Sequence, residues 1–148
     1  MGEADARRLA LRWLGLRALT RRELLVRLQR AGVGEPESTL DALQRQGWQS
    51  DQAVAHSERD RAQRRREGPL RLAHRLRQRG VDEGLIRDTV SAVDPDAWWE
   101  QAWREAERMG PGEGQRARLA RRLARQGYPV AIIARVLDRL GQENPDGG

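Results

Sequence analysis

Apolar residues recur along the chain at the spacing of one helical face, and no segment alternates with the period of two that marks a strand. Near the start, Ala6, Leu9, Ala10 and Trp13 follow the i, i+3, i+4, i+7 pattern of an amphipathic helix over residues 4–18. Similar spacing returns in the later segments, between turn residues. The pattern predicts an all-α fold.

Cap and turn residues predict where further helices begin and end. Thr20 and Glu23 form the T-x-x-E capping box, in which each side chain accepts a hydrogen bond from the other residue's backbone N–H. Gly32 stands where a glycine commonly ends a helix. Asp94 followed by Pro95 indicates another helix start, because Asp caps and Pro fits the first helical position. Together such signals predict nine helices.

The sequence Arg-Leu-x-x-x-Gly occurs three times, and its glycines Gly32, Gly80 and Gly127 lie 48 and 47 residues apart. A period of this length indicates tandem units, each too small to bury its apolar faces alone. We therefore expect three three-helix repeats stacked into an elongated, curved array. The expected segments are repeat 1 over 1–48, repeat 2 over 49–94, repeat 3 over 95–142 and a disordered tail over 143–148.

Large apolar residues are few, so the expected cores are small: the chain has five Trp, one Tyr and no Phe. Trp99 and Trp103 share one helical face and are expected to fill a core, although aromatic residues beside arginines also grip single-stranded nucleic acid. Trp48 is likewise expected to pack. Residues 56–68, by contrast, offer little but Ala62 to bury, so this part of its helix is expected to be mobile or to need a partner.

Composition excludes several classes of protein. There is no cysteine, and therefore no disulfide framework and no thiolate metal site. The N-terminal segment carries charge throughout, unlike a secretory signal, and no apolar stretch approaches the ~20 residues that span a bilayer. We expect a cytoplasmic monomer that does not enter a membrane.

The basic residues are the strongest chemical signal. All 28 are Arg and the net charge is +6. A GC-rich genome explains the choice of Arg over Lys but not its clustering, because residues 69–79 and 115–126 contain several Arg and no acid. Arginines spaced four apart repel one another, so such a stripe requires acids on a neighbouring helix or an anionic partner. The predicted partner-binding or DNA-binding residues are Arg27, Arg30, Arg71, Arg75, Arg79, Arg118, Arg121, Arg122 and Arg125.

No set of residues indicates catalysis. The two histidines, His56 and His74, do not form a metal-ligand pattern. The segment GPGEG lacks the Lys-Ser/Thr of a phosphate-binding loop, and no nucleophile has a local base partner. We expect no catalytic residues, no metal and no cofactor, and hence a protein that is not an enzyme.

Four short motifs follow one another along the chain. They are Thr-x-x-Glu-Leu from Thr20, Gly-Trp-x-x-Asp from Gly47, Gly-Pro-x-Arg-Leu from Gly68, and Arg-Arg-Leu-Ala-Arg-Gln-Gly-Tyr ending at Tyr128. Their order and spacing, within residues 5–140, resemble the bacterial RecX regulatory proteins. The resemblance implies a non-enzymatic protein that binds the RecA nucleoprotein filament and suppresses recombinase, ATPase and coprotease activities in DNA repair and the SOS response.

Direct binding to DNA is the alternative. Any arginine-rich face attracts phosphate, so weak DNA binding is expected in either case. A dedicated DNA-binding protein would use its three-helix units as helix-turn-helix-like modules, with Gly32, Gly80 and Gly127 in the turns and the following helices reading bases. The helices expected after Gly32 and Gly80 are acidic where a recognition helix should be basic, which favours the filament regulator.

Overall fold

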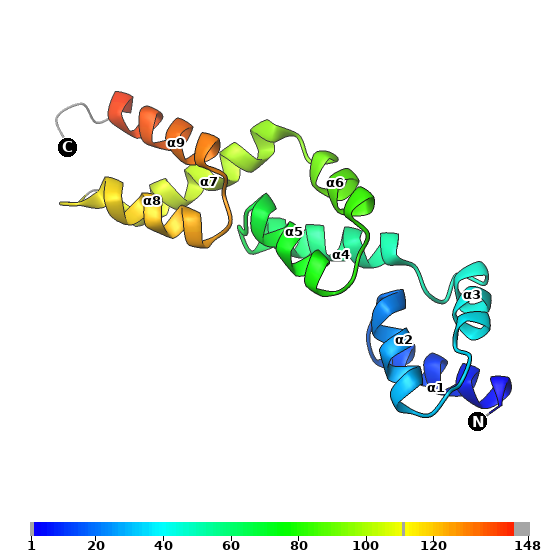
Figure 1. Ribbon diagram of the computed structural model, residues 1–148. Helices are drawn as coiled ribbons and strands as arrows, with labels where there is room; N and C mark the ends of the chain where they lie inside the picture. Colours follow the sequence, from blue (N-terminus) through cyan, green and yellow to red (C-terminus); the bar gives the residue numbers. More distant parts are fainter. Residues whose placement is uncertain (1, 111, 144–148) are drawn as a thin grey trace. The chain divides into compact units, whose positions relative to one another are not determined.

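The computed structural model describes residues 2–110 and 112–143, and all regular secondary structure within them is helical (Figure 1). The helices are α1 (Glu3–Leu16), α2 (Arg21–Arg30), α3 (Glu37–Arg45), α4 (Asp51–Arg64), α5 (Pro69–Gln78), α6 (Glu83–Ser91), α7 (Pro95–Met109), α8 (Gln115–Arg125) and α9 (Val130–Glu143). The prediction of an all-α fold is confirmed for this part of the chain. Because α9 continues to Glu143, the rest of the predicted tail, residues 144–148, lies outside the described residues.

Local hydrogen bonds confirm the predicted helix starts. The Glu23 N–H donates to Thr20 Oγ1 at 3.1 Å, and the Thr20 N–H donates to Glu23 Oε1 at 2.8 Å, which completes the capping box of α2. Asp94 caps α7 by accepting a 2.8 Å bond from the Asp96 N–H, and Pro95 is the first helical residue. These bonds satisfy backbone groups that a helix start otherwise leaves without partners.

The chain divides into two compact units, each built from two separate segments. Unit 1 comprises Met1–Ser57 and Leu76–Ile86, and unit 2 comprises Glu58–Arg75 and Arg87–Gly148. The boundaries fall inside α4, α5 and α6, whereas α1–α3 lie wholly in unit 1 and α7–α9 wholly in unit 2. The division into three repeats at residues 48 and 94 stays a prediction.

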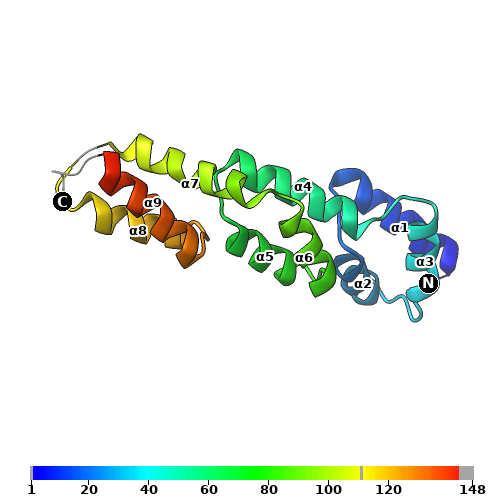
Figure 2. The same ribbon diagram turned by 90° about the horizontal axis from the view of Figure 1, so that it is seen from above.

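Each unit has its own apolar core. In unit 1, α1, α2 and α3 pack together around a cluster that includes Ala6, Ala10, Leu24, Leu28, Leu40 and Leu43. In unit 2, α7, α8 and α9 lie side by side in Figures 1 and 2, around a cluster that includes Trp99, Trp103, Leu119, Leu123, Tyr128 and Val136. Aliphatic side chains contribute most of both cores, as the scarcity of aromatic residues requires.

The tryptophan pair of α7 is buried and covered by arginines. The rings of Trp99 and Trp103 stack with centroids 6.4 Å apart and 11° between their planes. The guanidinium carbon of Arg135 lies 4.2 Å from the Trp99 centroid, and that of Arg139 lies 4.3 Å from the Trp103 centroid. These are cation–π distances that join α9 to α7. The prediction that the pair fills a core is confirmed.

One packing prediction is wrong, and one segment buries more than its apolar pattern indicated. Trp48 is 58% exposed, in the turn between α3 and α4, so it does not fill a core. Residues 56–68 bury Glu58 and Glu67 as well as Ala62. The two carboxylates can be buried because arginines pair with them, and such partners are not visible in the segment's own apolar pattern.

In unit 2, the turn between α4 and α5 lies against the turn between α8 and α9. The Gly68 N–H donates to the Gln126 carbonyl at 2.7 Å, and the Leu70 N–H donates to the Gly127 carbonyl at 2.9 Å. Gly127 has a φ of +92°, and a Cβ built on it would stand 2.4 Å from Arg71 Cβ and 2.5 Å from Arg71 N. Only glycine permits both this backbone conformation and this approach.

A related contact occurs in unit 1, between the turn before α2 and the turn after α5. Thr20 Oγ1 donates to the Arg79 carbonyl at 2.7 Å, and a Cβ on Gly80 would meet the Arg22 side chain at 2.3 Å. Gly32 shares the positive φ, at +89°, but has nothing within 4 Å of a built Cβ. At two of the three repeated glycines, the lack of a side chain therefore allows a neighbouring element to approach closely.

Candidate functional site

The nine predicted arginines differ in how far their side chains reach solvent. Seven are exposed: Arg27, Arg30, Arg71, Arg118, Arg121, Arg122 and Arg125. The side chains of Arg75 and Arg79 are only 24% and 14% exposed. Exposure alone therefore separates residues able to meet a large partner from two that are largely enclosed by the protein itself.

Arg79 is held within unit 1. Its Nη2 lies 2.8 Å from Glu23 Oε1 and its Nε lies 3.1 Å from Glu23 Oε2, a two-point contact between guanidinium and carboxylate. Its Nη2 also donates to the Ala18 carbonyl at 3.1 Å. Burial of Glu23 opposes ionisation, but the hydrogen bonds from Arg79 and Thr20 outweigh it, so the pKa of Glu23 lies below its ordinary value. Arg79 thus fastens the turn after α5 to the start of α2.

Arg75 is held within unit 2 by two buried carboxylates. Its Nη1 lies 3.3 Å from Glu58 Oε2, and its Nη2 pairs with Glu67 Oε2. Arg71, which is about half exposed, reaches the same Glu67 oxygen at 3.3 Å. A buried carboxylate is stable only when it is paired and hydrogen-bonded, so these arginines complete the fold around the end of α4.

Glu105 of α7 is the most deeply buried carboxylate among the described residues, at 2% exposure, and three arginines surround it. Arg122 Nε lies 3.0 Å from its Oε2, and Arg108 Nη1 and Arg66 Nη1 lie 3.2 Å and 3.8 Å from its Oε1. The predicted contact residue Arg122 therefore has an internal partner, although its side chain remains 46% exposed.

The exposed arginines of α8 show a different arrangement. Within the part of the chain that the structure describes, Arg118, Arg121 and Arg125 make no ion pair with a carboxylate. Residues 115–137 contain no Asp or Glu at all. Of the arginines predicted to repel one another on α8, only Arg122 is therefore compensated by a carboxylate of the described residues, which leaves the charges of the other three available to an anionic partner.

A hollow of about 250 Å³ in unit 1 brings four arginines together. Arg22, Arg27, Arg30 and Arg79 line it, with Val26, Gln78 and Glu23. Its one carboxylate already pairs with Arg79. The balance of charge is positive, which suits a phosphate or carboxylate. Arg22 was not among the predicted residues; its place two helical turns before Arg30 is the signal that could have identified it.

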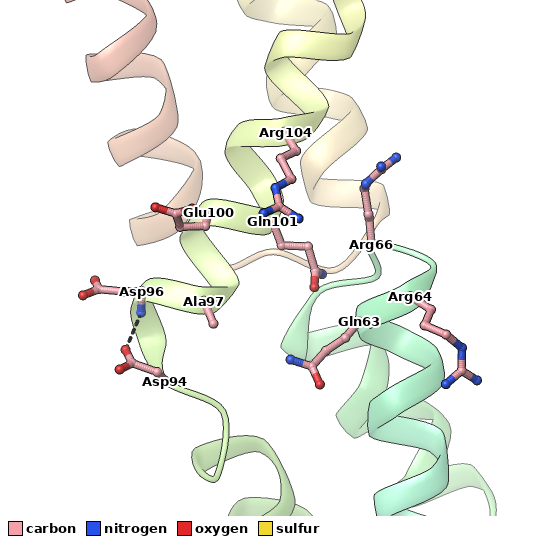
Figure 3. A pocket seen from close by; sticks show the side chains of 9 residues that line it. All are labelled: Gln63, Arg64, Arg66, Asp94, Asp96, Ala97, Glu100, Gln101 and Arg104. Atoms are coloured by element: carbon pink, nitrogen blue, oxygen red, sulfur yellow. Dashed lines mark hydrogen bonds between the residues drawn. The ribbon is translucent and has the colours of Figure 1, made fainter.

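A larger cavity of about 680 Å³ lies in unit 2, between the end of α4 and the first half of α7 (Figure 3). Its charged lining consists of Arg64, Arg66, Arg104, Asp94, Asp96 and Glu100. Asp94 is engaged in capping α7, and Asp96 Oδ1 lies 3.1 Å from Arg135 Nη1. None of these residues was predicted, because the two segments are distant in sequence and their charges alternate in sign.

Behind this cavity, Tyr128 joins the turns of unit 2. Its hydroxyl donates to the Arg66 carbonyl at 3.0 Å and accepts a 2.8 Å bond from Gln101 Nε2. Gln101 Nε2 also donates to the Glu67 carbonyl at 2.9 Å. Burial raises the pKa of Tyr128 to about 12, so the phenol is neutral and remains a hydrogen-bond donor at physiological pH.

Neither a metal centre nor a membrane span is found in the described ranges. No three His, Cys, Asp or Glu residues among them are grouped so as to hold a metal ion. None of the helices there combines the length and apolarity needed to cross a bilayer. The chemistry that these residues offer is charge pairing, hydrogen bonding and apolar contact.

Known proteins resemble this chain in sequence, and solved structures resemble it in fold. Residues 58–90 match the family model for the second three-helix domain of RecX. The regulatory protein RecX of Chromobacterium violaceum is 36% identical over 127 residues, covering 84% of this chain and 83% of that protein. The RecX of Halorhodospira halophila is 34% identical over 162 residues, covering 99% of this chain and all of that protein.

The crystal structure of RecX from Lactobacillus salivarius aligns with a TM-score of 0.85, covering 95% of this chain and 97% of that one. The identity of that pair is 17%, so the comparison bears on the fold alone. The relatives at 34–36% identity extend the likeness to sequence over most of their length. The chain belongs to the RecX family of regulatory proteins.

Proposed function

We propose that this protein binds the RecA nucleoprotein filament and inhibits its recombinase, ATPase and coprotease activities, and so acts in DNA repair and the SOS response. The observation that carries the proposal is sequence identity of 34% to a regulatory protein RecX along that protein's whole length. The exposed arginines of α8 support it, because a helix that carries several arginines and no acid favours association with an anionic assembly.

The proposed mechanism is binding without bond chemistry. A monomer in the cytoplasm would occupy the filament through its arginines and hinder the movements or contacts that the filament needs. Within the predicted contact set, Arg118, Arg121 and Arg125 are the strongest candidates because they are exposed and make no ion pair with a carboxylate of the described residues. Arg27 and Arg30, in the hollow of unit 1, come next.

Reversal of Arg75 or Arg122 is a poor test of binding. A Glu at either position would stand beside a buried carboxylate, Glu67 or Glu105, that loses a cation at the same time. Breaking a buried ion pair in this way costs roughly 3–5 kcal/mol, so lost inhibition would reflect unfolding. Both residues remain predicted contacts, but exposed positions give the cleaner experiment.

The test measures RecA ATPase activity on single-stranded DNA with increasing amounts of protein. For the double variant Arg118→Glu/Arg125→Glu, the concentration that gives half-maximal inhibition should rise about tenfold or more, because each reversed charge weakens a long-range attraction. The matched control is Arg45→Glu/Arg87→Glu, two exposed arginines outside the predicted set, which should inhibit within about twofold of the unaltered protein. Equal inhibition by both pairs refutes the α8 contact; no inhibition by the unaltered protein refutes the function.

Direct DNA binding is the second candidate, and the four-arginine hollow of unit 1 favours it. Phosphate contacts of this kind weaken steeply as salt rises and carry no sequence preference. Anisotropy titrations with labelled duplexes of several sequences, at low and physiological salt, separate the two ideas. Selective binding that survives physiological salt, and that Arg27→Glu/Arg30→Glu abolishes, would support a dedicated DNA-binding protein.

A further inference from the structure

Two large aliphatic side chains are exposed on neighbouring backbone segments of unit 2. Leu70, the second residue of α5, is 56% exposed, and Val130, the first residue of α9, is 82% exposed. A single exposed aliphatic residue has no special meaning, but two on backbone segments that are hydrogen-bonded to each other offer apolar surface that gains free energy when covered. We call these two residues the Leu70–Val130 patch.

The contact between the turns brings the two backbone segments of the patch together. The Leu70 N–H donates to the Gly127 carbonyl at 2.9 Å, and Val130 follows Gly127 by three residues. The second bond, from the Gly68 N–H to the Gln126 carbonyl at 2.7 Å, fixes the same two backbones. With Tyr128 bonded to Gln101 and Arg66 beneath, the patch rests on a firmly held part of unit 2, so little conformational entropy is lost on binding.

The patch lies on segments that contain arginines and no acid. Residues 68–75, around Leu70, contain two Arg, and residues 115–137, around Val130, contain six. Arg71 and Arg75 are paired with Glu67. On α8, Arg122 is paired with Glu105, whereas Arg118, Arg121 and Arg125 pair with no carboxylate of the described residues. A partner that covers the aliphatic side chains therefore meets unpaired cations on the α8 side, which favours acidic residues around an apolar centre.

We propose that the Leu70–Val130 patch docks an acidic protein segment that presents an aliphatic or aromatic side chain. The inference rests on the proposed function and deepens it, since it assigns this face of unit 2 to the filament's protein and not to its nucleic acid. Phosphate contacts need cations alone, and bases stack on aromatic or guanidinium planes, which Leu and Val lack. Exposed aliphatic side chains gain most from an apolar protein side chain.

The test uses Leu70→Ser and Val130→Ser in the full chain, because serine removes the apolar surface without changing the net charge. Both positions are exposed and stand in the first turn of a helix, where serine is tolerated. Leu16→Ser is the matched control: the same substitution at an 81% exposed leucine that belongs to unit 1. Circular dichroism melts verify that all three variants remain folded.

Two readouts are compared for each variant: binding to RecA filaments on single-stranded DNA, and binding to the bare oligonucleotide. Leu70→Ser and Val130→Ser should each weaken filament binding about tenfold, the scale of a central apolar contact, and leave oligonucleotide binding within about twofold. Leu16→Ser should change neither. Because apolar contact is insensitive to salt, the loss should persist when salt is raised.

Three outcomes overturn the inference. If Leu70→Ser and Val130→Ser bind filaments as tightly as Leu16→Ser does, the patch is not a docking site, although the proposed function still holds. If both substitutions weaken binding to the filament and to the bare oligonucleotide by similar factors, this face of unit 2 contacts nucleic acid and not protein. If the unaltered protein is folded but does not bind filaments, both the proposed function and the docking role of the patch are wrong.

Discussion

Replacement of Gly127 by alanine tests the contact between the two turns of unit 2. An L-residue at a φ of +92° is strained by about 1–2 kcal/mol. The added Cβ would stand 2.4 Å from Arg71 Cβ and 2.5 Å from its backbone N, so the turns must separate. Separation weakens the bonds from the Gly68 and Leu70 N–H groups, at about 1 kcal/mol each. Gly127→Ala should therefore destabilise unit 2 by roughly 3–4 kcal/mol.

Gly32→Ala is the matched control. Its φ of +89° is nearly the same, but nothing lies within 4 Å of the added Cβ, so only the backbone strain of about 1–2 kcal/mol is expected. Denaturant unfolding followed by circular dichroism compares the two variants. Hydrogen exchange at the Gly68 and Leu70 amides adds a local measurement, and these amides should lose protection in Gly127→Ala alone.

Equal destabilisation by the two alanine substitutions, with both amides still protected, would refute this reasoning. The shared positive φ would then account for the whole effect. The close approach of Arg71 to Gly127 would contribute nothing to stability. The explanation given for the repeated Arg-Leu-x-x-x-Gly motif would be wrong for this copy.

Two further predictions concern titratable groups of unit 2. Glu105→Gln removes a buried charge among arginines and should lower the free energy of unfolding by roughly 2–4 kcal/mol, measured by denaturant unfolding. The control Glu107→Gln, at an exposed position, should change it by no more than about 0.5 kcal/mol. Equal effects of the two substitutions would mean that the buried carboxylate does not stabilise the fold. The pKa of Tyr128 is about 12 in the folded protein and about 10 in the unfolded chain. The neutral phenol therefore contributes fully to the free energy of unfolding below pH 10, and this contribution, about 3 kcal/mol, is lost as the pH rises through 12. Tyr128→Phe should lack that loss of stability at alkaline pH. If the variant and the unaltered protein show the same dependence of stability on pH, Tyr128 is not the group responsible.

Helix positions could be predicted because their signals are local. The capping box joins Thr20 and Glu23, which are three residues apart, and Asp94 caps the helix that follows it directly. Such bonds depend on the backbone conformation of one turn and not on distant packing. The all-helical character and most helix starts can therefore be predicted from the amino-acid sequence by itself.

The pairing of arginines could not be predicted, because the partners are far apart in sequence. The pattern required either neighbouring acids or an anionic partner for the arginine stripes, and did not say which. Arg122 and Glu105 are 17 residues apart, and Arg79 and Glu23 are 56 apart. Only the packing of helices brings them together. The exposure of Trp48 was missed for a similar reason: a large apolar residue in a turn packs only if another element covers it.

The discontinuity of the two units limits how the protein can be shortened. The segments of the two units alternate along the chain, with one boundary inside α5, so no single cut yields both units intact. A cut between Gly68 and Arg79 would place Gly68 and Gln126 on different fragments, and also Thr20 and Arg79. Neither half could then rebuild its turn contact alone. Expression of isolated halves should give aggregation-prone products, so the functions of the two units are better separated by point substitution than by truncation.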